Sequence, residues 1–195
     1  MCGMYATIGI LAALRHRDAT GEGQHIDLAL VDTQMAWLIN EGTNYLTSGK
    51  VPERRGNAHP NIVPYDAFAC KDGHVLIAVG NDAQFSRFCN GIGLPDLALD
   101  GKFATNLDRI ANRVDLTKRI TARTSELTKA EVIDLLQSVK IPVGPINTVE
   151  EALTSDQAQA RQTVVSIAAD DLENGALRVL ANPLKFSRTP VVYDR

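Results

Sequence analysis

Residues 65–80 read YDAFACKDGHVLIAVG, and this stretch predicts a β-hairpin. Its second half, HVLIAV at residues 74–79, is an almost continuous apolar run, which is typical of a buried strand. Residues 71–73 (Lys-Asp-Gly) provide the polar, glycine-containing turn between the two strands. A hairpin alone is only marginally stable, so we expect it to begin one compact unit that includes the following segments.

Helices are predicted after the hairpin by their capping residues. Asn81 can cap a helix in which Gln84 stands three residues later to answer it. The apolar face of this helix combines three large side chains, those of Phe85, Phe88 and Ile92. Asn106 is a good cap for a long amphipathic helix that ends near Thr124.

The last part of the chain predicts short helices and strands. Residues 128–131 (TKAE) form a capping box that opens a helix, and residues 148–151 (TVEE) form a second one. Between them, residues 141–149 (IPVGPINTV) contain two prolines, which exclude a helix and favour extended backbone. Residues 163–190 predict two strands joined by a turn near residues 173–175.

The first fifty residues predict a helix, a strand and a second helix. Residues 1–18 (MCGMYATIGILAALRHRD) form an apolar helix pattern without a capped start, and residues 18–24 (DATGEGQ) follow as a turn. Residues 25–30 (HIDLAL) alternate as a strand, and residues 31–49 place apolar side chains on one helical face. A single strand cannot form a sheet, so we expect its partner strands to come from elsewhere.

The composition is ordinary for a soluble globular protein, with 195 residues, 45% hydrophobic and 22% charged. The net charge of −3 gives no basic footprint for nucleic acid and no polybasic patch for a membrane surface. The apolar run at the start is too short to span a bilayer and, unlike a secretory signal, is followed rather than preceded by arginines. Three widely spaced cysteines predict reduced thiols, at Cys2, Cys70 and Cys89. We therefore expect a cytoplasmic protein, in a bacterial cytosol or an organellar matrix.

Residues 56–65, GNAHPNIVPY, are the candidate functional stretch. The sequence has no P-loop, GxGxxG, HExxH or GxSxG pattern, and its four scattered histidines give no metal-binding spacing. Gly56 lets the backbone approach a ligand closely, and the neighbouring amides can bind an anion or a carbonyl oxygen. The alternative is a rigid linker between domains, in which the prolines only limit the conformations of the chain.

Six segments, in order along the chain, resemble the class III CoA-transferases. This family includes formyl-CoA transferase, carnitine CoA-transferase and the succinyl-CoA-dependent dicarboxylate CoA-transferases. The segments are GEGQHIDLALVD (21–32), GNAHPNIVPYDAF (56–68), DGHVLIAVGNDAQF (72–85), KFATNLDRIANR (102–113), IPVGPINTVEEAL (141–153) and NPLKFSRTP (182–190). The resemblance extends over essentially the whole chain, and GNAHPNIVPY is most similar to the succinyl-CoA:dicarboxylate branch.

The resemblance implies an α/β fold in which a small α+β domain is inserted into a Rossmann-like large domain, here incomplete. Residues 1–48 would be the end of the N-terminal section of the large domain. Residues 49–64 would be the linker and cleft loop, and residues 65–145 the small domain. Residues 146–195 would return to the large domain. Two chains of the family interlace, so the resemblance also implies a homodimer.

The resemblance implies transfer of CoA from an acyl-CoA thioester to a small carboxylic or dicarboxylic acid. An aspartate acts as the nucleophile and forms an aspartyl-CoA intermediate, and the CoA thioester is a substrate, with no covalently bound cofactor. The matching aspartate position falls immediately upstream of Met1, and three nearby aspartates lie on the wrong elements: Asp18, Asp27 and Asp32. The residues that remain as binding candidates stand at the place of the family's glycine-rich loop: Gly56, Asn57, Ala58 and His59.

Two other functions stay open from the sequence. The first is an α-methylacyl-CoA racemase, a fold-mate whose acid and base residues would also lie upstream of this chain. The second is a catalytically silent fragment, in which exposed sheet edges and apolar faces favour self-association. We expect no transferase activity from the 195 residues alone.

Overall fold

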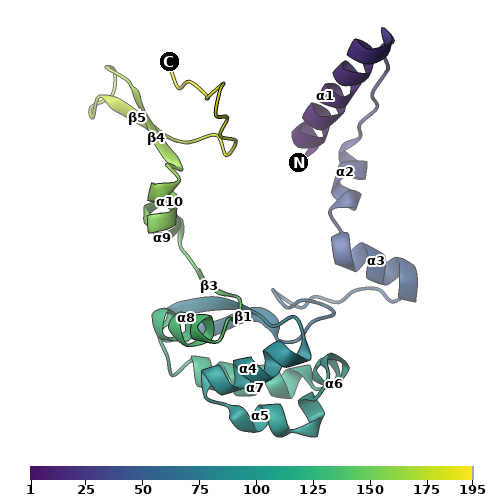
Figure 1. Cartoon of the computed structure of the whole chain (residues 1–195), viewed down its shortest axis with the longest axis vertical. Helices are drawn as coiled ribbons and strands as arrows, with labels where there is room; N and C mark the ends of the chain where they lie inside the picture. Colours follow the sequence, from purple (N-terminus) through teal and green to yellow (C-terminus); the bar gives the residue numbers. More distant parts are fainter. Residues whose placement is uncertain (195) are drawn as a thin grey trace.

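The computed structural model of the chain describes residues 1–194 and shows a compact body with two projecting arms (Figure 1). The body comprises residues 60–146, in teal and green. The N-terminal arm, residues 1–49, and the C-terminal arm, residues 149–194, extend from the same side of the body (Figure 1). The body therefore lies in the middle of the sequence, and both chain ends lie away from it.

The predicted hairpin is confirmed and forms two strands of the sheet in the body. Strand β1 (Tyr65–Cys70) pairs antiparallel with β2 (Gly73–Ala78). The predicted extended segment provides the third strand, because β3 (Val143–Ile146) pairs antiparallel with the other edge of β2. Since β3 comes from a distant part of the sequence, it closes the body as one unit.

Helices cover one face of this sheet. They are α4 (Asp82–Ile92), α5 (Pro95–Leu99), α6 (Asn106–Ala111), α7 (Arg113–Thr124) and α8 (Lys129–Ser138), with a 3-10 turn at Gly101–Phe103. Along β2, Val75 and Ile77 are buried while His74 and Leu76 are exposed, as expected when only one face of a sheet is covered.

The core of the body is a single cluster of buried apolar side chains. The predicted apolar face of α4 is confirmed, because Phe85, Phe88 and Ile92 are all buried in this cluster. Burial of a large apolar side chain stabilises a fold by about 1.5–3 kcal/mol. The cluster extends from Val63 to Ile141, so the compact unit predicted from the hairpin onward is confirmed.

Three predicted helix starts are confirmed, although the side chain of Gln84 accepts from the N–H of Gly80 and not from that of Asn81. The side chains of Asn81, Thr128 and Thr148 each accept a hydrogen bond from the backbone N–H three residues later. The carboxylates of Glu131 and Glu151 reach back to the N–H groups of Thr128 and Thr148, both at 2.8 Å. These bonds satisfy donors that the first turn of a helix otherwise leaves without partners.

The prediction of one helix from Asn106 to Thr124 was wrong in two respects: its capping residue and its being a single helix. Thr105 caps α6 instead, with the Asp108 carboxylate accepting from the Thr105 N–H at 3.0 Å. The backbone leaves helical geometry at Asn112, with φ −109° and ψ 23°, so α6 and α7 are separate helices. Because Thr105 serves as the cap, the Asn106 side chain is available to bind the segment before β1.

The N-terminal arm contains α1 (Cys2–Thr20), α2 (Leu30–Ala36) and α3 (Ile39–Ser48). The strand predicted at residues 25–30 was wrong, because no other segment of residues 1–194 pairs with it and the extended chain runs beside α1. The helix predicted at residues 31–49 is divided, because Ile39 has a φ of 47°, outside helical geometry.

Helix α1 buries none of its side chains. Ile8 and Leu11 are 63% and 61% exposed, although both are large and apolar. Among the helices of residues 1–194, none is long and apolar enough to cross a membrane. The helix predicted at the start of the chain is confirmed, and it extends from Cys2 to Thr20.

The C-terminal arm contains two short helices followed by a two-stranded sheet. The helices are α9 (Val149–Thr154) and α10 (Asp156–Ala160). Strand β4 (Val164–Ala168) pairs antiparallel with β5 (Ala176–Leu180), as predicted. Gly175 has a φ of 63° in the connection, a left-handed conformation that glycine adopts without steric cost.

Candidate functional site

The candidate residues lie in one irregular segment between α3 and β1, here called the site loop and defined as residues 55–64. Gly56 has a φ of 67°, and a Cβ placed there would meet nothing within 4 Å. Gly56 and Asn57 are exposed, and Ala58 and His59 are partly buried. The four predicted residues are consecutive in this loop, with Gly56 and Asn57 at its open end.

His59 is held by contacts at its ring and at its backbone. Its Nδ1 accepts the backbone N–H of Asn61 at 3.1 Å, and the ring stacks on Tyr65 with centroids 5.2 Å apart. The backbone N–H of His59 donates to the carbonyl of Tyr65 at 2.9 Å. These bonds tie His59 to the first residue of β1.

The second ring nitrogen of His59 faces α3. Nε2 lies 3.1 Å from the side-chain amide of Asn40. Which of these two groups donates is set by the tautomer of the imidazole. The contact joins the ring of His59 to α3.

Helix α3 contacts the site loop at two further points. The side-chain amides of Asn44 and Asn61 exchange two hydrogen bonds, of 2.9 and 3.4 Å. Arg55 pairs with Glu41 at 2.5 Å, while Glu41 Oε2 is buried without a hydrogen-bond partner among the described residues. The sequence analysis predicted an apolar face for residues 31–49. It did not predict that polar side chains of α3 bind the site loop.

Charged side chains of both signs line the open end of the loop. One hollow there is lined by Arg54 and Arg55 together with Glu41 and Glu53, and a neighbouring hollow by Lys50, Arg55 and Glu41. The pKa of the Arg113 guanidinium is lowered by its burial and by the nearby charge of Arg55. Acidic and basic side chains therefore mix at this end of the loop, and Arg55 is already paired with Glu41.

Glu41 brings a carboxylate to the site loop through its pair with Arg55, and Glu53 lines the hollow there. The ion pairs and hydrogen bonds of the site loop in residues 1–194 involve none of the three aspartates set aside in the sequence, Asp18, Asp27 and Asp32. Asp18 pairs instead with the adjacent Arg17, at 2.9 Å. No group of His, Cys, Asp and Glu side chains in this part of the chain could hold a metal ion.

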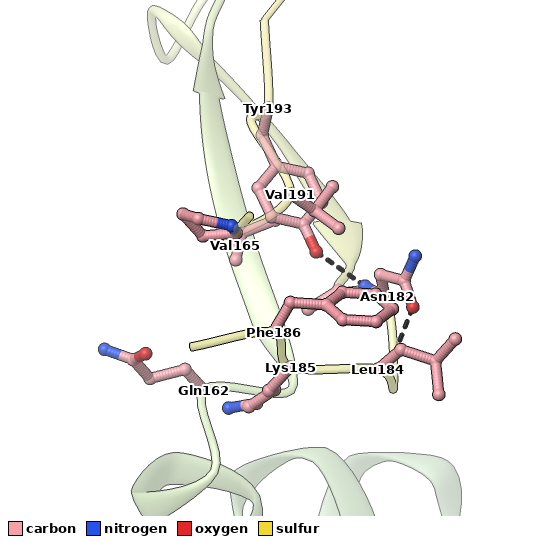
Figure 2. A pocket seen from close by; sticks show the side chains of 10 residues that line it. Gln162, Val165, Asn182, Leu184, Lys185, Phe186, Val191 and Tyr193 are labelled. Carbon is pink, nitrogen blue, oxygen red and sulfur yellow. Dashed lines mark hydrogen bonds between the residues drawn. The ribbon is translucent and has the colours of Figure 1, made fainter. Parts of the chain in front are cut away.

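A separate hollow lies in the C-terminal arm and is formed by the tail folding back on β4 (Figure 2). The Tyr193 hydroxyl accepts the backbone N–H of Asn182 at 2.6 Å, and Asn182 Oδ1 accepts the N–H of Leu184 at 2.8 Å. The Lys185 ammonium donates to the carbonyl of Arg161. Because these polar groups bind one another, we interpret the NPLKFSRTP segment as a structural element that folds the tail back on β4.

Comparison with known proteins identifies the family. The family model of CoA-transferase family III matches residues 1–195. The chain belongs to CoA-transferase family III. It is 42% identical over 193 residues to the succinate–glutarate CoA-transferase of Agrobacterium fabrum, covering 99% of this chain and 48% of that protein. It is 35% identical to the acetyl-CoA:oxalate CoA-transferase of Acetobacter aceti, covering 95% of this chain and 46% of the relative. This family III chain therefore spans about half the length of the curated relatives it matches.

Solved structures show the same family III fold. A CAIB/BAIF family protein from Brucella suis has a TM-score of 0.75 and 41% identity, covering 97% of this chain and 48% of that structure. Rv3272 from Mycobacterium tuberculosis has a TM-score of 0.81 at 22% identity, covering 98% of this chain and 50% of that one, and shows likeness of fold alone. The predicted α/β fold, present here in part, is thereby confirmed.

Proposed function

We propose that this chain is part of an enzyme that transfers CoA from an acyl-CoA thioester to a small dicarboxylic acid. The observation that carries the proposal is the 42% identity, over 193 residues, with a succinate–glutarate CoA-transferase. The CoA thioester is a substrate in this proposal, and no covalently bound cofactor is required.

In the proposed reaction, an aspartate carboxylate attacks the carbonyl of the donor thioester. The C–S bond breaks, CoA departs as the thiolate, and the aspartate and the donor acyl group are joined as a mixed anhydride. The thiolate attacks the aspartyl carbonyl, releasing the donor as a free acid and forming an aspartyl-CoA thioester. The acceptor carboxylate then attacks this thioester, and the returning thiolate takes the acceptor acyl group and frees the aspartate. We do not assign the nucleophile to Asp18, Asp27 or Asp32, because no hydrogen bond or ion pair joins any of them to the site loop among residues 1–194.

The site loop would provide oxyanion stabilisation in these steps. Each carbonyl attack places negative charge on an oxygen, and backbone N–H groups fixed in advance stabilise such charge. Gly56 and Asn57 carry such N–H groups at the open end of the loop, whereas the N–H of Ala58 donates to the Arg55 carbonyl at 3.4 Å. The alternative that the loop is only a linker predicts no effect of these residues on turnover.

The organisation of the whole enzyme is also a proposal. Residues 1–48 and 146–195 would belong to a Rossmann-like large domain and residues 49–64 to the linker. Residues 65–145 would form the small domain, which agrees with a core that extends from Val63 to Ile141. We infer an interlaced homodimer from the resemblance, and a reducing, cytoplasmic setting from the free thiols of the three cysteines.

A chimera tests the proposed activity. In the Agrobacterium fabrum enzyme, the part aligned with this chain is replaced by residues 1–195, and the purified chimera is mixed with succinyl-CoA and glutarate. We expect glutaryl-CoA and succinate to form in equal amounts, measured by liquid chromatography with mass spectrometry. Acetyl-CoA with oxalate is the parallel substrate pair, since the Acetobacter aceti relative is named for it.

The outcomes of this assay separate the candidate functions. A folded chimera that exchanges CoA with none of glutarate, oxalate, malate and mesaconate contradicts the proposal. Deuterium incorporation at the α-carbon of a 2-methylacyl-CoA, without CoA exchange, would instead identify a racemase. Assay of the 195-residue chain alone tests the expectation that it is silent, and turnover by it would refute that expectation.

A further inference from the structure

The segment KFATNLDRIANR (102–113) contains three polar residues at spacings of three and four: Asn106, Arg109 and Arg113. Residues so spaced lie on one face of a helix. Although the helix is interrupted at Asn112, all three side chains bind the same short stretch of backbone, residues 60–63. We propose that Asn106, Arg109 and Arg113 form a clamp that positions the site loop for CoA transfer, an inference that rests on the proposed function.

The clamp binds consecutive backbone groups of the loop. The amide of Asn106 donates to the carbonyl of Asn61 at 2.8 Å and accepts the N–H of Val63 at 3.1 Å. Arg109 Nε donates to the carbonyl of Val63 at 2.7 Å, and Arg113 Nη2 to that of Pro60 at 2.9 Å. Each bond joins residues at least 43 positions apart in the sequence, so none of them arises from local chain geometry.

These bonds compensate for the irregular backbone of the loop. Pro60 and Pro64 have no N–H, and residues 60–63 belong to no helix or strand, so their carbonyls need donors from elsewhere. The clamp provides donors for the carbonyls of Pro60, Asn61 and Val63. The N–H of Val79, just after β2, donates to the carbonyl of Pro64 at 2.9 Å.

Arg109 anchors the clamp in the core. Its side chain has no exposed surface, and the guanidinium lies 4.4 Å from the centre of the Phe85 ring. Two further bonds reach the Phe103 carbonyl at 3.0 Å and Asp82 at 2.7 Å. The position of Val63 is thereby set by the rigid part of the body.

The two halves of the loop differ in how many hydrogen bonds hold their backbone. In residues 60–63, which the clamp binds, the N–H of Asn61 donates to His59 and orients its ring, which stacks on Tyr65. In the other half, one backbone bond is present among the described residues, from the N–H of Ala58 to Arg55 at 3.4 Å. The clamp thus holds the base from which Gly56–Ala58 project, and its members are positioning residues that need not touch substrate.

Amide hydrogen exchange on the 195-residue protein tests the clamp without any assay of activity. Asn106→Ala removes two loop bonds, and we expect the amides of Asn61 and Val63 to exchange at least tenfold faster. The matched control is Asn112→Ala on the same helical junction, because the Asn112 amide binds Lys102 and Asp108 and not the loop. Arg109 is not substituted in this test, since loss of so buried a cation would destabilise the whole body and raise exchange throughout it.

Turnover in the chimera tests the link to function. We expect Asn106→Ala and Arg113→Met to lower kcat at least tenfold while KM for succinyl-CoA changes less than threefold. Arg113→Lys keeps a donor for the Pro60 carbonyl and should recover part of kcat. Asn112→Ala should retain kcat even when its melting temperature falls as much as that of Asn106→Ala.

The outcomes are separable. Unchanged exchange at Asn61 and Val63 in the Asn106→Ala protein, or exchange equal to that of Asn112→Ala, overturns the clamp. Faster exchange with an unchanged kcat in an active chimera overturns the positioning role and leaves the transferase proposal intact. An inactive unsubstituted chimera contradicts the proposed transferase function and with it the positioning role, while the exchange data still decide whether the loop is clamped.

Discussion

Arg109 is fully buried, and each of its side-chain nitrogens has a partner. The carbonyls of Val63 and Phe103 and the carboxylate of Asp82 accept from it, at 2.7, 3.0 and 2.7 Å. A buried guanidinium is tolerated because these acceptors replace the water it loses. One side chain thereby joins the site loop, the 3-10 turn and the start of α4.

Substitution of Arg109 should be strongly destabilising. Arg109→Met removes all three bonds and leaves two backbone carbonyls without their donor, which costs about 1–3 kcal/mol for each such group. We expect the free energy of unfolding to fall by about 3 kcal/mol or more, measured by urea denaturation. The control is Arg119→Met, because Arg119 is an exposed partner of Asp115, and such pairs contribute about 0–1 kcal/mol. Equal losses in the two variants would contradict this view of Arg109.

The Cys89 thiol should be inert in the folded protein. Burial in the core raises the pKa of Cys89 to about 12, and the nearby Arg109 charge offsets this only in part. At pH 8 the reactive thiolate is therefore almost absent. We expect Cys89→Ala to leave unchanged the number of thiols that react rapidly with a disulfide reagent at pH 8, and to lower it by one in denaturant. Rapid labelling of Cys89 in native protein would show that the α4 core opens readily.

At the scale of elements, the starts of α4, α8 and α9 were predictable from sequence, whereas the start of α6 and the long-range pairings were not. The capping boxes at Thr128 and Thr148 depend on residues three positions apart, so a short window contains them. The strand predicted at residues 25–30 depends on a partner strand, and the alternating pattern cannot provide one. The site loop was found from its own composition, whereas Asn40 and Asn106 contact it from elements that are distant in sequence.

The capping boxes should make stability depend on pH in the acid range. Backbone N–H donors hold the pKa of Glu131 and of Glu151 below the usual range, and hydrogen bonds to Thr105 do so for Asp108. A carboxylate whose pKa is lower in the folded state stabilises the fold above its unfolded pKa, about 4.3 for glutamate. That contribution disappears as pH falls through this value toward the folded pKa.

The Glu131→Gln, Glu151→Gln double variant tests this dependence. Glutamine keeps an oxygen that accepts the capping bond but cannot ionise. We expect the melting temperature of the variant to fall less between pH 6 and pH 3 than that of the unsubstituted protein. A matched control exchanges two glutamates outside the capping bonds, Glu53 and Glu173, for glutamine. If the double variant and the control lose the same amount on acidification, the boxes do not cause the dependence.

At the scale of the whole molecule, burial is concentrated in the body. The buried apolar side chains from Val63 to Ile141 form one cluster, while α1 buries none of its own. Large apolar side chains of the N-terminal arm remain exposed, among them Leu30 at 75% and Leu46 at 85%. Folding of the body therefore depends on its own core, and the arms present apolar surface to whatever surrounds them.

This surface should make the 195-residue protein self-associate. Exposed apolar area is driven out of water by contact with another such surface, at about 25 cal/mol per Å² buried. We expect light scattering after size exclusion to give a mass well above the 21.1 kDa of one chain. Ile8→Glu with Leu11→Lys places charges on one face of α1 and should lower that mass.

The control places the same charges on exposed apolar residues of the body. Leu107 and Val114 are 76% and 84% exposed, on α6 and α7. Leu107→Glu with Val114→Lys changes the net charge as the α1 pair does, because each pair adds one acid and one base. Association that survives this control and is lost in the α1 variant assigns the contact to the N-terminal arm. A protein that stays monomeric at 100 μM without substitution would mean that the apolar arm is stable in water, contrary to the energetic argument.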